Sequence, residues 1–268
     1  MVKTLDRATP GATTPWDHAP LGSGLGVPVA VGGDLTAESV LAAHLRGVFC
    51  LPRSETSDIA DNEATYAPDV EAGDIRLLPC ASNPYSILWW SPHMRYVIPT
   101  AELALGRTTR QALRPRPWTT TVNADFDGVL NACRGTRRPR WITEPLMSSL
   151  RELRQDGWAK SIEVWDGDQL VGGLFGLALN RVFVMSSAFH RQPNAAKAAM
   201  ADLARRTAAG NIRLLDAQVR TEYTVRLGSR AIPRAEYLQW LDPAERDPGI
   251  LAEDRQDVQR LLARPQTR

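Results

Sequence analysis

The sequence predicts an α+β protein, because a run of antiparallel strands is followed by a helix and one further strand. Residues 159–165 alternate between apolar and polar side chains, as half-buried strands do. The Asp-Gly turn at 166–169 predicts a hairpin into residues 170–178. A third strand-like segment follows at 181–187. This order of elements is typical of the α+β class.

The helix and the last strand of this pattern each carry a polar feature. The helix is predicted from Asn194 to Gly210, and Lys197 falls in its first turn, where an anion could bind beside unpaired backbone N–H groups. A lysine on a helix is usually only solvated, so this signal is weak alone. The strand is predicted over 212–219.

The N-terminal part of the chain predicts fewer elements. Residues 1–26 are rich in Pro, Gly and Thr and are expected to be mobile. A helix capped by Asp34 or Thr36 should end at Gly47. The acidic stretch 52–83 shows little periodicity and is interpreted as a long loop. The short apolar segment ILWWSP at 87–92 is expected to be a buried strand.

The sequence changes in character from about residue 100. Residues 119–122 predict a strand, and a helix should begin at Asn123 and end at Gly135. A second helix is expected from Pro145 to Gln155. These elements lead directly into the antiparallel strands.

The composition and the distribution of charge indicate which kind of binding partner the protein could have. The 268 residues are 43% hydrophobic and 23% charged, an ordinary globular balance with a net charge of +2. The charge is uneven: residues 106–140 hold eight arginines against two aspartates, and residues 52–83 hold seven acids against two arginines. The basic block is either a surface for a polyanion or a solvated Arg-rich face.

Several classes of protein are disfavoured by residue usage. Three cysteines that are far apart do not suggest a disulfide framework, and the four histidines lack metal-ligand spacing, so we expect no metal. No apolar run is long enough to span a bilayer, and the first 18 residues lack an apolar signal region. The protein is therefore expected in the cytoplasm.

The sharpest polar feature is the segment LLDAQV. On a strand over 212–219, Asp216 and Gln218 would share one face, next to each other in an otherwise apolar segment. Buried polar groups must be hydrogen-bonded, so the pair is either structural or functional. In the functional interpretation, the carboxylate orients the amide and the amide positions a substrate group.

Eight sequence blocks together resemble the bacterial leucyl/phenylalanyl-tRNA–protein transferases over residues 27 to 242. They are VGGDLTAESVLAAHLRGVF, ILWWSPHMR, RTTRQALR, WIT, SIEVWDGDQLVGGLFG, NAAK, LLDAQ and LGSRAIPRAEYL. The resemblance implies a small N-terminal domain at 27–100, a larger GNAT-like domain at 101–242 and a C-terminal tail at 243–268. The acidic segment near 52–80 is longer than in the family.

The resemblance also implies an activity. Members move leucine, phenylalanine or methionine from aminoacyl-tRNA to the N-terminal Arg or Lys of a protein, which marks that protein for degradation as an N-degron. The reaction is aminolysis of an ester, for which no metal or cofactor is required. An α-amine has a pKa near ~8, so a fair fraction is neutral at pH 7.

The resemblance further implies roles for individual residues. Asp216 would orient Gln218, which would contact the reacting amine; Trp141 would pack on the terminal adenosine, as aromatic residues do at RNA ends. Other residues are expected around the substrate or along the tRNA. The substrate-binding set is Trp89, Trp90, Phe183, Met185, Phe189, Asn194 and Lys197, and the tRNA-binding set is Arg95, Arg107, Arg110 and Arg114. Phe183, Met185 and Phe189 are expected to make the aminoacyl pocket apolar, whereas Trp89 and Trp90 could equally serve interdomain packing.

The chain departs from the family pattern at several of these places. Ser186 replaces an acidic residue of the family's active site, and a serine cannot supply charge. Leu51 stands where the family has a pocket tryptophan, and Ala217, Tyr223 and Arg226 replace Cys, His and Ser. These changes leave two alternatives open: a small-molecule amine as acceptor in a biosynthetic pathway, or a tRNA-binding relative with weakened catalysis.

Overall fold

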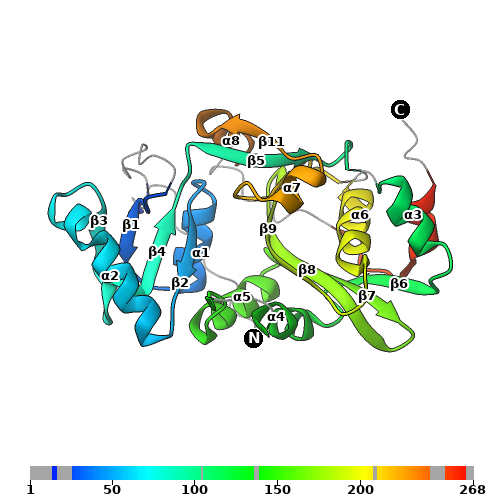
Figure 1. The fold of residues 1–268 in the computed structure, drawn as a ribbon, viewed down its shortest axis with the longest axis horizontal. Coiled ribbons are helices and arrows are strands. Elements are labelled where there is room, and N and C mark those ends of the chain that lie inside the picture. The colour runs from blue at the N-terminus through cyan, green and yellow to red at the C-terminus, as the bar shows by residue number, and fades with distance from the viewer. Residues whose placement is uncertain are drawn as a thin grey trace. The chain divides into compact units, whose positions relative to one another are not determined.

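The computed structural model describes residues 14–16, 26–103, 105–135, 139–207, 210–241 and 251–263. The chain forms two compact units that do not follow the sequence in order. Unit 1 comprises residues 1–94, 137–156 and 233–244, and unit 2 comprises 95–136, 157–232 and 245–268. Both units mix helices and strands, which confirms the α+β class (Figure 1).

Unit 1 contains a four-stranded sheet in the order β2-β4-β1-β3. Its strands are β1 (Ala30–Gly32), β2 (Phe49–Pro52), β3 (Arg76–Leu78) and β4 (Ile87–Trp90). Strand β4 is antiparallel to both β1 and β2, and β3 is parallel to β1. The predicted strand at ILWWSP is confirmed as β4, at the centre of this sheet.

The helices of unit 1 include the predicted N-terminal one. Helix α1 (Ala37–His44) is capped by Thr36, whose hydroxyl accepts a hydrogen bond from Ser39 N. It packs against α5 (Glu144–Gln155), where Ser149 Oγ donates to Leu35 O. Unit 1 also contains a short 3₁₀ turn, η1 (Pro84–Ser86), and α8 (Arg234–Leu241).

The acidic stretch 52–83 is not a loop, so that prediction is wrong. It contains α2 (Thr56–Glu71), a 16-residue helix with no fully buried side chain, followed by β3. The helix makes polar and edge contacts instead: Asn62 Nδ2 donates to Tyr85 O at 2.9 Å, and Tyr66 meets Trp90 edge-on at 6.3 Å. A helix without a fully buried face lacks the apolar periodicity on which the prediction depended.

Unit 2 is built on an eight-stranded sheet in the order β11-β5-β10-β9-β8-β7-β6-β12. Strands β6 to β9 are antiparallel neighbours, of which β7, β8 and β9 follow one another by short turns, and β10 is parallel to β9 and antiparallel to β5. The long strands β7 to β9 bend along their length, so the sheet is curled (Figure 1). The strands are β5 (Met94–Pro99), β6 (Trp118–Val122), β7 (Ala159–Asp166), β8 (Gln169–Leu179), β9 (Val182–His190), β10 (Leu214–Asp216), β11 (Arg230–Pro233) and β12 (Gln256–Asp257).

Two helices cover opposite faces of this sheet, and the contacts of two glycines in β8 show which helix covers which face. A Cβ on Gly172 would meet Ala195 of α6 (Ala195–Thr207), whereas a Cβ on Gly173 would meet Val129 of α4 (Phe126–Gly135). Neighbouring strand residues point to opposite faces. The core of unit 2 therefore has two layers of packing, one under each helix. The remaining helices are α3 (Arg107–Leu113), α7 (Glu222–Arg226) and η2 (Val258–Leu262).

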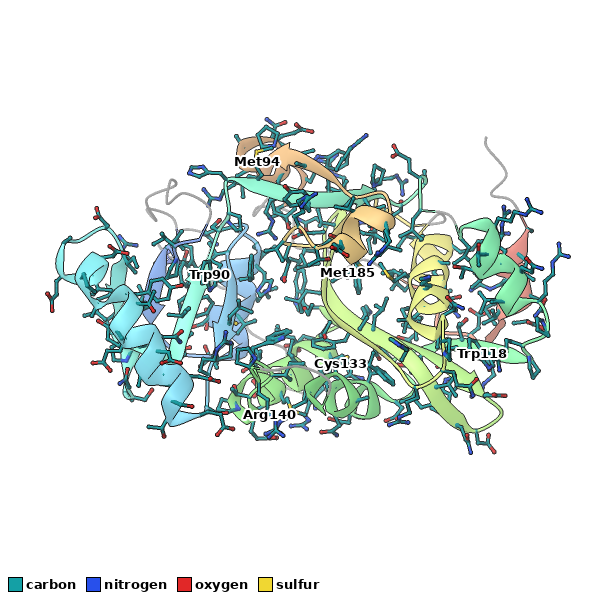
Figure 2. The ribbon with its side chains drawn as sticks, viewed as in Figure 1. Trp90, Met94, Trp118, Cys133, Arg140 and Met185 are labelled. Atoms are coloured by element: carbon teal, nitrogen blue, oxygen red, sulfur yellow. The ribbon has the colours of Figure 1, made fainter. Side chains whose placement is uncertain are left out.

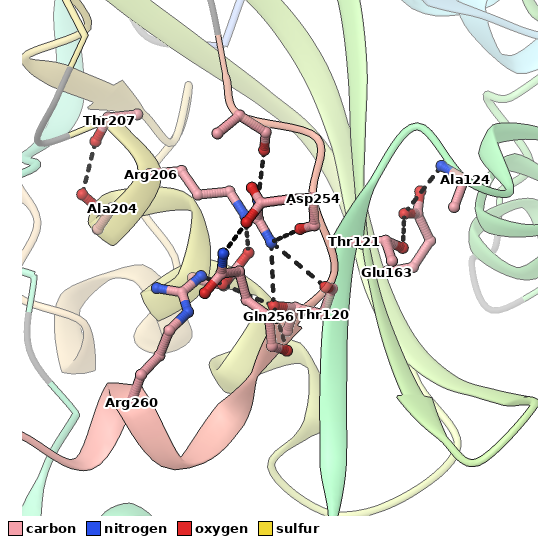
Figure 3. A network of polar contacts seen from close by, with 12 residues as sticks. Thr120, Thr121, Ala124, Glu163, Ala204, Arg206, Thr207, Asp254, Gln256 and Arg260 are labelled. Carbon is pink, nitrogen blue, oxygen red and sulfur yellow. Dashed lines mark hydrogen bonds and ion pairs between the residues drawn. The ribbon is translucent and has the colours of Figure 1, made fainter.

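Much of the C-terminal segment packs into unit 2, contrary to the expected tail at 243–268. Strand β12 pairs with β6, and Leu251, Val258 and Leu261 belong to the core. A buried polar network holds the segment (Figure 3). In it Asp202, which is fully buried, binds Arg206 Nε at 2.6 Å and also binds Arg260. Residues 242–250 and 264–268 lie outside the described residues.

The N-terminal stretch 1–26, expected to be mobile, is described only at residues 14–16 and 26. Trp16 is buried, and its ring centroid lies 4.6 Å from that of Trp89. Arg76 donates to Pro15 O at 2.5 Å. This short piece is therefore packed onto unit 1. Within the described ranges, no helix is long and apolar enough to cross a membrane.

Candidate functional site

Asp216 ends strand β10 and fixes the turn that follows it. Its side chain is fully buried, and its Oδ1 accepts a hydrogen bond from Gln218 N at 2.7 Å. Ala217 N donates to Tyr96 O at 2.8 Å, so the turn is also held to β5. The carboxylate therefore orients the main chain at Gln218.

Gln218 does not share a strand face with Asp216, so that part of the sequence prediction is wrong. The strand stops at Asp216, and Gln218 has a φ of 63°. Left-handed backbone is uncommon for residues other than Gly and is found where surrounding contacts impose it. The hydrogen bond that Gln218 N donates to the Asp216 carboxylate is such a contact. The orientation of the half-buried Gln218 is thus set by the turn and not by the alternation of side chains along a strand.

Arg95 forms a buried ion pair with Asp216. The arginine is 1% exposed, on β5, where Val97 stands opposite Asp216. The prediction that Arg95 contacts tRNA does not fit this position, because a buried guanidinium bound to a carboxylate cannot face a phosphate backbone. Its partner is the carboxylate that sets the Gln218 turn.

Ser186 lies at a β-bulge in strand β9. Phe175 pairs with Ser187 and Gly176 pairs with Met185, so Ser186 has no residue opposite it on β8. Bulges redirect side chains and are common next to active sites. A Cβ at Gly176 would lie 2.1 Å from Val184 O, so the close approach of the two strands requires glycine there.

The bulge separates the three apolar residues expected to line one pocket. Phe183 and Met185 pair with Ala178 and Gly176, on the α6 face of the sheet, whereas Phe189 pairs with Gly173, on the α4 face. Met185, labelled on β9 in Figure 2, is half-buried, and the other two are buried. Phe189 is therefore not part of the surface that Phe183 and Met185 form.

A pocket of about 350 Å³ lies within unit 2, and two predicted residues line it. Arg107 at the start of α3 and Lys197 in the first turn of α6 both face it, together with Arg226 of α7. Its apolar lining is Leu103, Leu105, Met200 and Leu227. Arg110 and Arg114 lie further along α3 and are not among the lining residues. Asn194 precedes α6 with a φ of 71°, and its carbonyl accepts from Ala198 N.

The three predicted tryptophans belong to unit 1. Trp89 is 1% exposed, packs on Trp16 and donates from Nε1 to Gly32 O at 2.8 Å. Trp90 and Trp141 are half-buried. Among the described residues, the buried Nε1 of Trp90 has no hydrogen-bond partner. Trp89 thus serves packing within its unit, and Trp90 retains an unused donor.

Glu163, which the sequence prediction missed as a polar feature, is a fully buried carboxylate on β7. Burial raises its pKa, although Ser161 Oγ and Thr121 Oγ1 donate to it at 2.5 Å each and Ala124 N donates at 3.2 Å. Alternation could not indicate this burial, because a glutamate between Ile162 and Val164 is expected on the solvent face of a half-buried strand. These donors tie β6, β7 and the start of α4 together.

Metal chemistry has no evident site in the part of the chain that the structure describes, which contains no group of three or more His, Cys, Asp or Glu able to hold an ion. Cys50 and Cys133 are buried thiols, and burial raises the pKa of Cys50 to about 12.

Comparison with known proteins places the chain among the aminoacyltransferases. The family model for leucyl/phenylalanyl-tRNA protein transferase matches residues 97–242, and the chain belongs to this family. The leucyl/phenylalanyl-tRNA–protein transferase of Shewanella oneidensis is 36% identical over 80% of this chain and 79% of its own length. That of Shewanella baltica OS155 is 34% identical over 82% of both chains. A solved protein of unknown function from Bacteroides thetaiotaomicron covers 59% of this chain and 58% of its own at a TM-score of 0.39 and 10% identity, which is too low to bear on the fold.

Proposed function

We propose that the protein transfers leucine, phenylalanine or methionine from aminoacyl-tRNA to the N-terminal Arg or Lys of an acceptor protein. Family membership over most of the chain supports the reaction class. The observation that carries the proposal to particular residues is the Asp216–Gln218 turn. It fixes an amide-bearing residue in a strained backbone conformation by a buried carboxylate.

The proposed reaction is aminolysis of the ester that joins the amino acid to the terminal ribose. The neutral α-amine attacks the ester carbonyl carbon, a C–N bond forms, and the C–O bond to the ribose breaks. The amine loses one proton and the departing ribose oxygen gains one. The acyl donor is already activated, so the protein's contribution is to position the two substrates and to stabilise the oxyanion.

Residue roles follow from this chemistry. Gln218 contacts the reacting amine, and Asp216 acts as a positioning residue through the Gln218 main chain. Ser186, at the bulge of β9, can donate or accept one hydrogen bond but cannot supply charge. Phe183 and Met185 would contribute to the aminoacyl pocket. Phe189 is not assigned to this pocket, because it lies on the other face of the sheet.

The RNA end is assigned to aromatic and basic residues. Trp141 of unit 1 would stack on the terminal adenosine, and Trp90 of the same unit is proposed to contact the substrate. Arg107, Arg110 and Arg114 of α3 and the nearby Lys197 would contact phosphates. The GNAT-like description of unit 2 and a cytoplasmic location remain proposals that go with this activity. No specific observation favours a small-molecule amine as acceptor.

The test is a transfer assay with labelled Leu-, Phe- and Met-tRNA and a peptide that begins with Arg or Lys. Label should appear in the peptide. Gln218→Ala should lower the rate of transfer at least 100-fold, as the loss of a positioned transition-state contact does. Gln169→Ala is the matched control, because Gln169 is an exposed glutamine at the start of β8.

The outcomes separate the alternatives. A peptide beginning with Ala should remain unlabelled, which checks the acceptor. Full activity of Gln218→Ala would remove that residue from the site. If wild-type protein binds tRNA but labels no peptide, the proposal of protein transfer fails.

A further inference from the structure

The pocket of unit 2 brings together three cations from segments far apart in the sequence. Arg107 comes from α3, Lys197 from α6 and Arg226 from α7. The remaining lining residues are Leu, Met, Gly and Thr, so none of the described residues that line the pocket is an acid. Like charges gathered around one cavity repel one another unless an anion enters it. This arrangement therefore favours an anionic ligand.

The shape and lining of the pocket restrict the anion further. A volume of about 350 Å³ is at the lower end of small-molecule sites and exceeds the space needed by one inorganic ion. Leu105 and Leu227 pack against the core of unit 2 and give the pocket an apolar floor. A lining that combines three cations with apolar side chains suits a phosphate ester whose attached body is flat or apolar, as a nucleotide is.

Arg226 is available to such a ligand. Its only recorded ion pair in the described part of the chain is with Glu222, at 3.5 Å, and both side chains are largely exposed, at 72% and 88%. An exposed pair at this spacing on a helix is weak and easily exchanged for a stronger partner. A phosphate bound in the fork of a guanidinium is such a partner.

We propose that Arg226 is a tRNA-binding residue of this chain, which holds a nucleotide phosphate of the donor RNA in the pocket together with Arg107 and Lys197. The inference rests on the proposed function for the identity of the RNA. The pocket itself requires only a phosphate ester, whose source is either the RNA backbone or a free nucleotide.

The experiment measures binding of deacylated tRNA to wild-type protein and to Arg226→Ala over a range of salt concentrations. Loss of one phosphate contact should lower the slope of log affinity against log salt by about 0.7–0.9 and weaken binding by about five- to ten-fold near 0.1 M salt. Arg226→Lys should recover part of this loss. Arg230→Ala is the matched control, because Arg230 is an exposed arginine with an exposed Glu102 partner at 3.6 Å and does not line the pocket.

Two further affinity measurements identify which phosphate the pocket binds. The affinity for AMP and for tRNA without its single-stranded 3′ end identifies the source of the phosphate. A loss with Arg226→Ala that is confined to AMP would overturn the assignment to RNA. An unchanged tRNA affinity and salt slope in Arg226→Ala, with thermal stability intact, would overturn it as well.

Failure of the proposed function would look different. If wild-type protein labels no peptide while Arg226→Ala still loses tRNA affinity and salt slope, transfer fails and the pocket assignment stands. If wild-type protein labels the peptide and Arg226→Ala binds tRNA as tightly, the pocket assignment fails and transfer stands.

Discussion

The buried pair of Arg95 and Asp216 makes a quantitative prediction about stability. Arg95→Met keeps most of the aliphatic volume but leaves the Asp216 carboxylate without its guanidinium. Two unit charges about 3 Å apart attract by roughly 5–6 kcal/mol at an effective dielectric constant of 20. Part of that attraction offsets the cost of burying both charges, and removing one partner of a buried pair costs about 3–5 kcal/mol. We expect a loss in this range, because both side chains are at most 2% exposed.

The double variant tests whether the effects of the two charges on stability are coupled. Asp216→Asn alone should also destabilise, because it leaves the buried arginine unmatched, yet its amide oxygen can still accept from Gln218 N. Combining it with Arg95→Met removes both charges and keeps the turn. We expect the double variant to lie within about 2 kcal/mol of the wild type, which gives a coupling energy of at least about 2 kcal/mol.

The assay is urea unfolding followed by far-ultraviolet circular dichroism, with the free energy of unfolding taken from the midpoint and slope. Arg230→Met is the control, because it removes one partner of an exposed pair in the same unit and should cost less than about 1 kcal/mol. The reasoning is refuted if Arg95→Met costs no more than this control, or if the two single losses simply add in the double variant.

Three other perturbations have defined outcomes. Gly176→Ala should destabilise the protein by more than about 2 kcal/mol, because the added Cβ would meet a backbone carbonyl oxygen at 2.1 Å. Gly135→Ala is the control and should be neutral or stabilising, because there is open space around Gly135. Thermal unfolding compares the stability of the two variants. Burial raises the folded-state pKa of the Glu163 carboxyl, so the wild type loses stability as pH rises from 4.5 through that pKa, because the folded protein holds the proton more tightly than the unfolded chain does. Glu163→Gln has no proton to lose and should therefore gain stability relative to the wild type over this range. Urea midpoints at several pH values check the sign, and a parallel pH dependence of the two proteins would contradict it. Arg206→Met should remove the hydrogen bonds by which α6 holds Ala252 and Asp254 of the C-terminal segment, so limited proteolysis should cut near residues 251–263 faster than in the wild type, and equal cleavage rates would count against the network.

Sequence patterns predicted the elements that bury apolar side chains and are bounded by turn residues. The hairpin of β7 and β8, the strand β9, the helix α6 and the short strand β4 all lie where apolar periodicity and turn residues indicated them. The same reasoning failed for α2, which has no fully buried face, and for residues 251–263. Elements held by polar contacts or by an edge of a sheet leave little periodic signal.

The site was predictable in its parts and not in its geometry. Asp216 and Gln218 stand out as polar residues in an apolar segment, but the end of the strand between them depends on tertiary contacts. Arg95 could have been paired with Asp216, since an arginine in an apolar strand needs a buried acid. The convergence of Arg107 and Arg226 on one pocket requires contacts across more than a hundred residues of sequence.

The substitution of Ser186 for an acid changes how the proposed reaction can be assisted. The bulge of β9 presents a hydroxyl where a carboxylate would add charge, and the Asp216 carboxylate is already engaged by Arg95 and by Gln218 N. Neither position then offers a base for the amine proton. In the proposed reaction, with Ser186 and Asp216 as the polar groups beside the amine, the rate would depend on amine that is already neutral and on how well Gln218 and the RNA contacts hold the two substrates together.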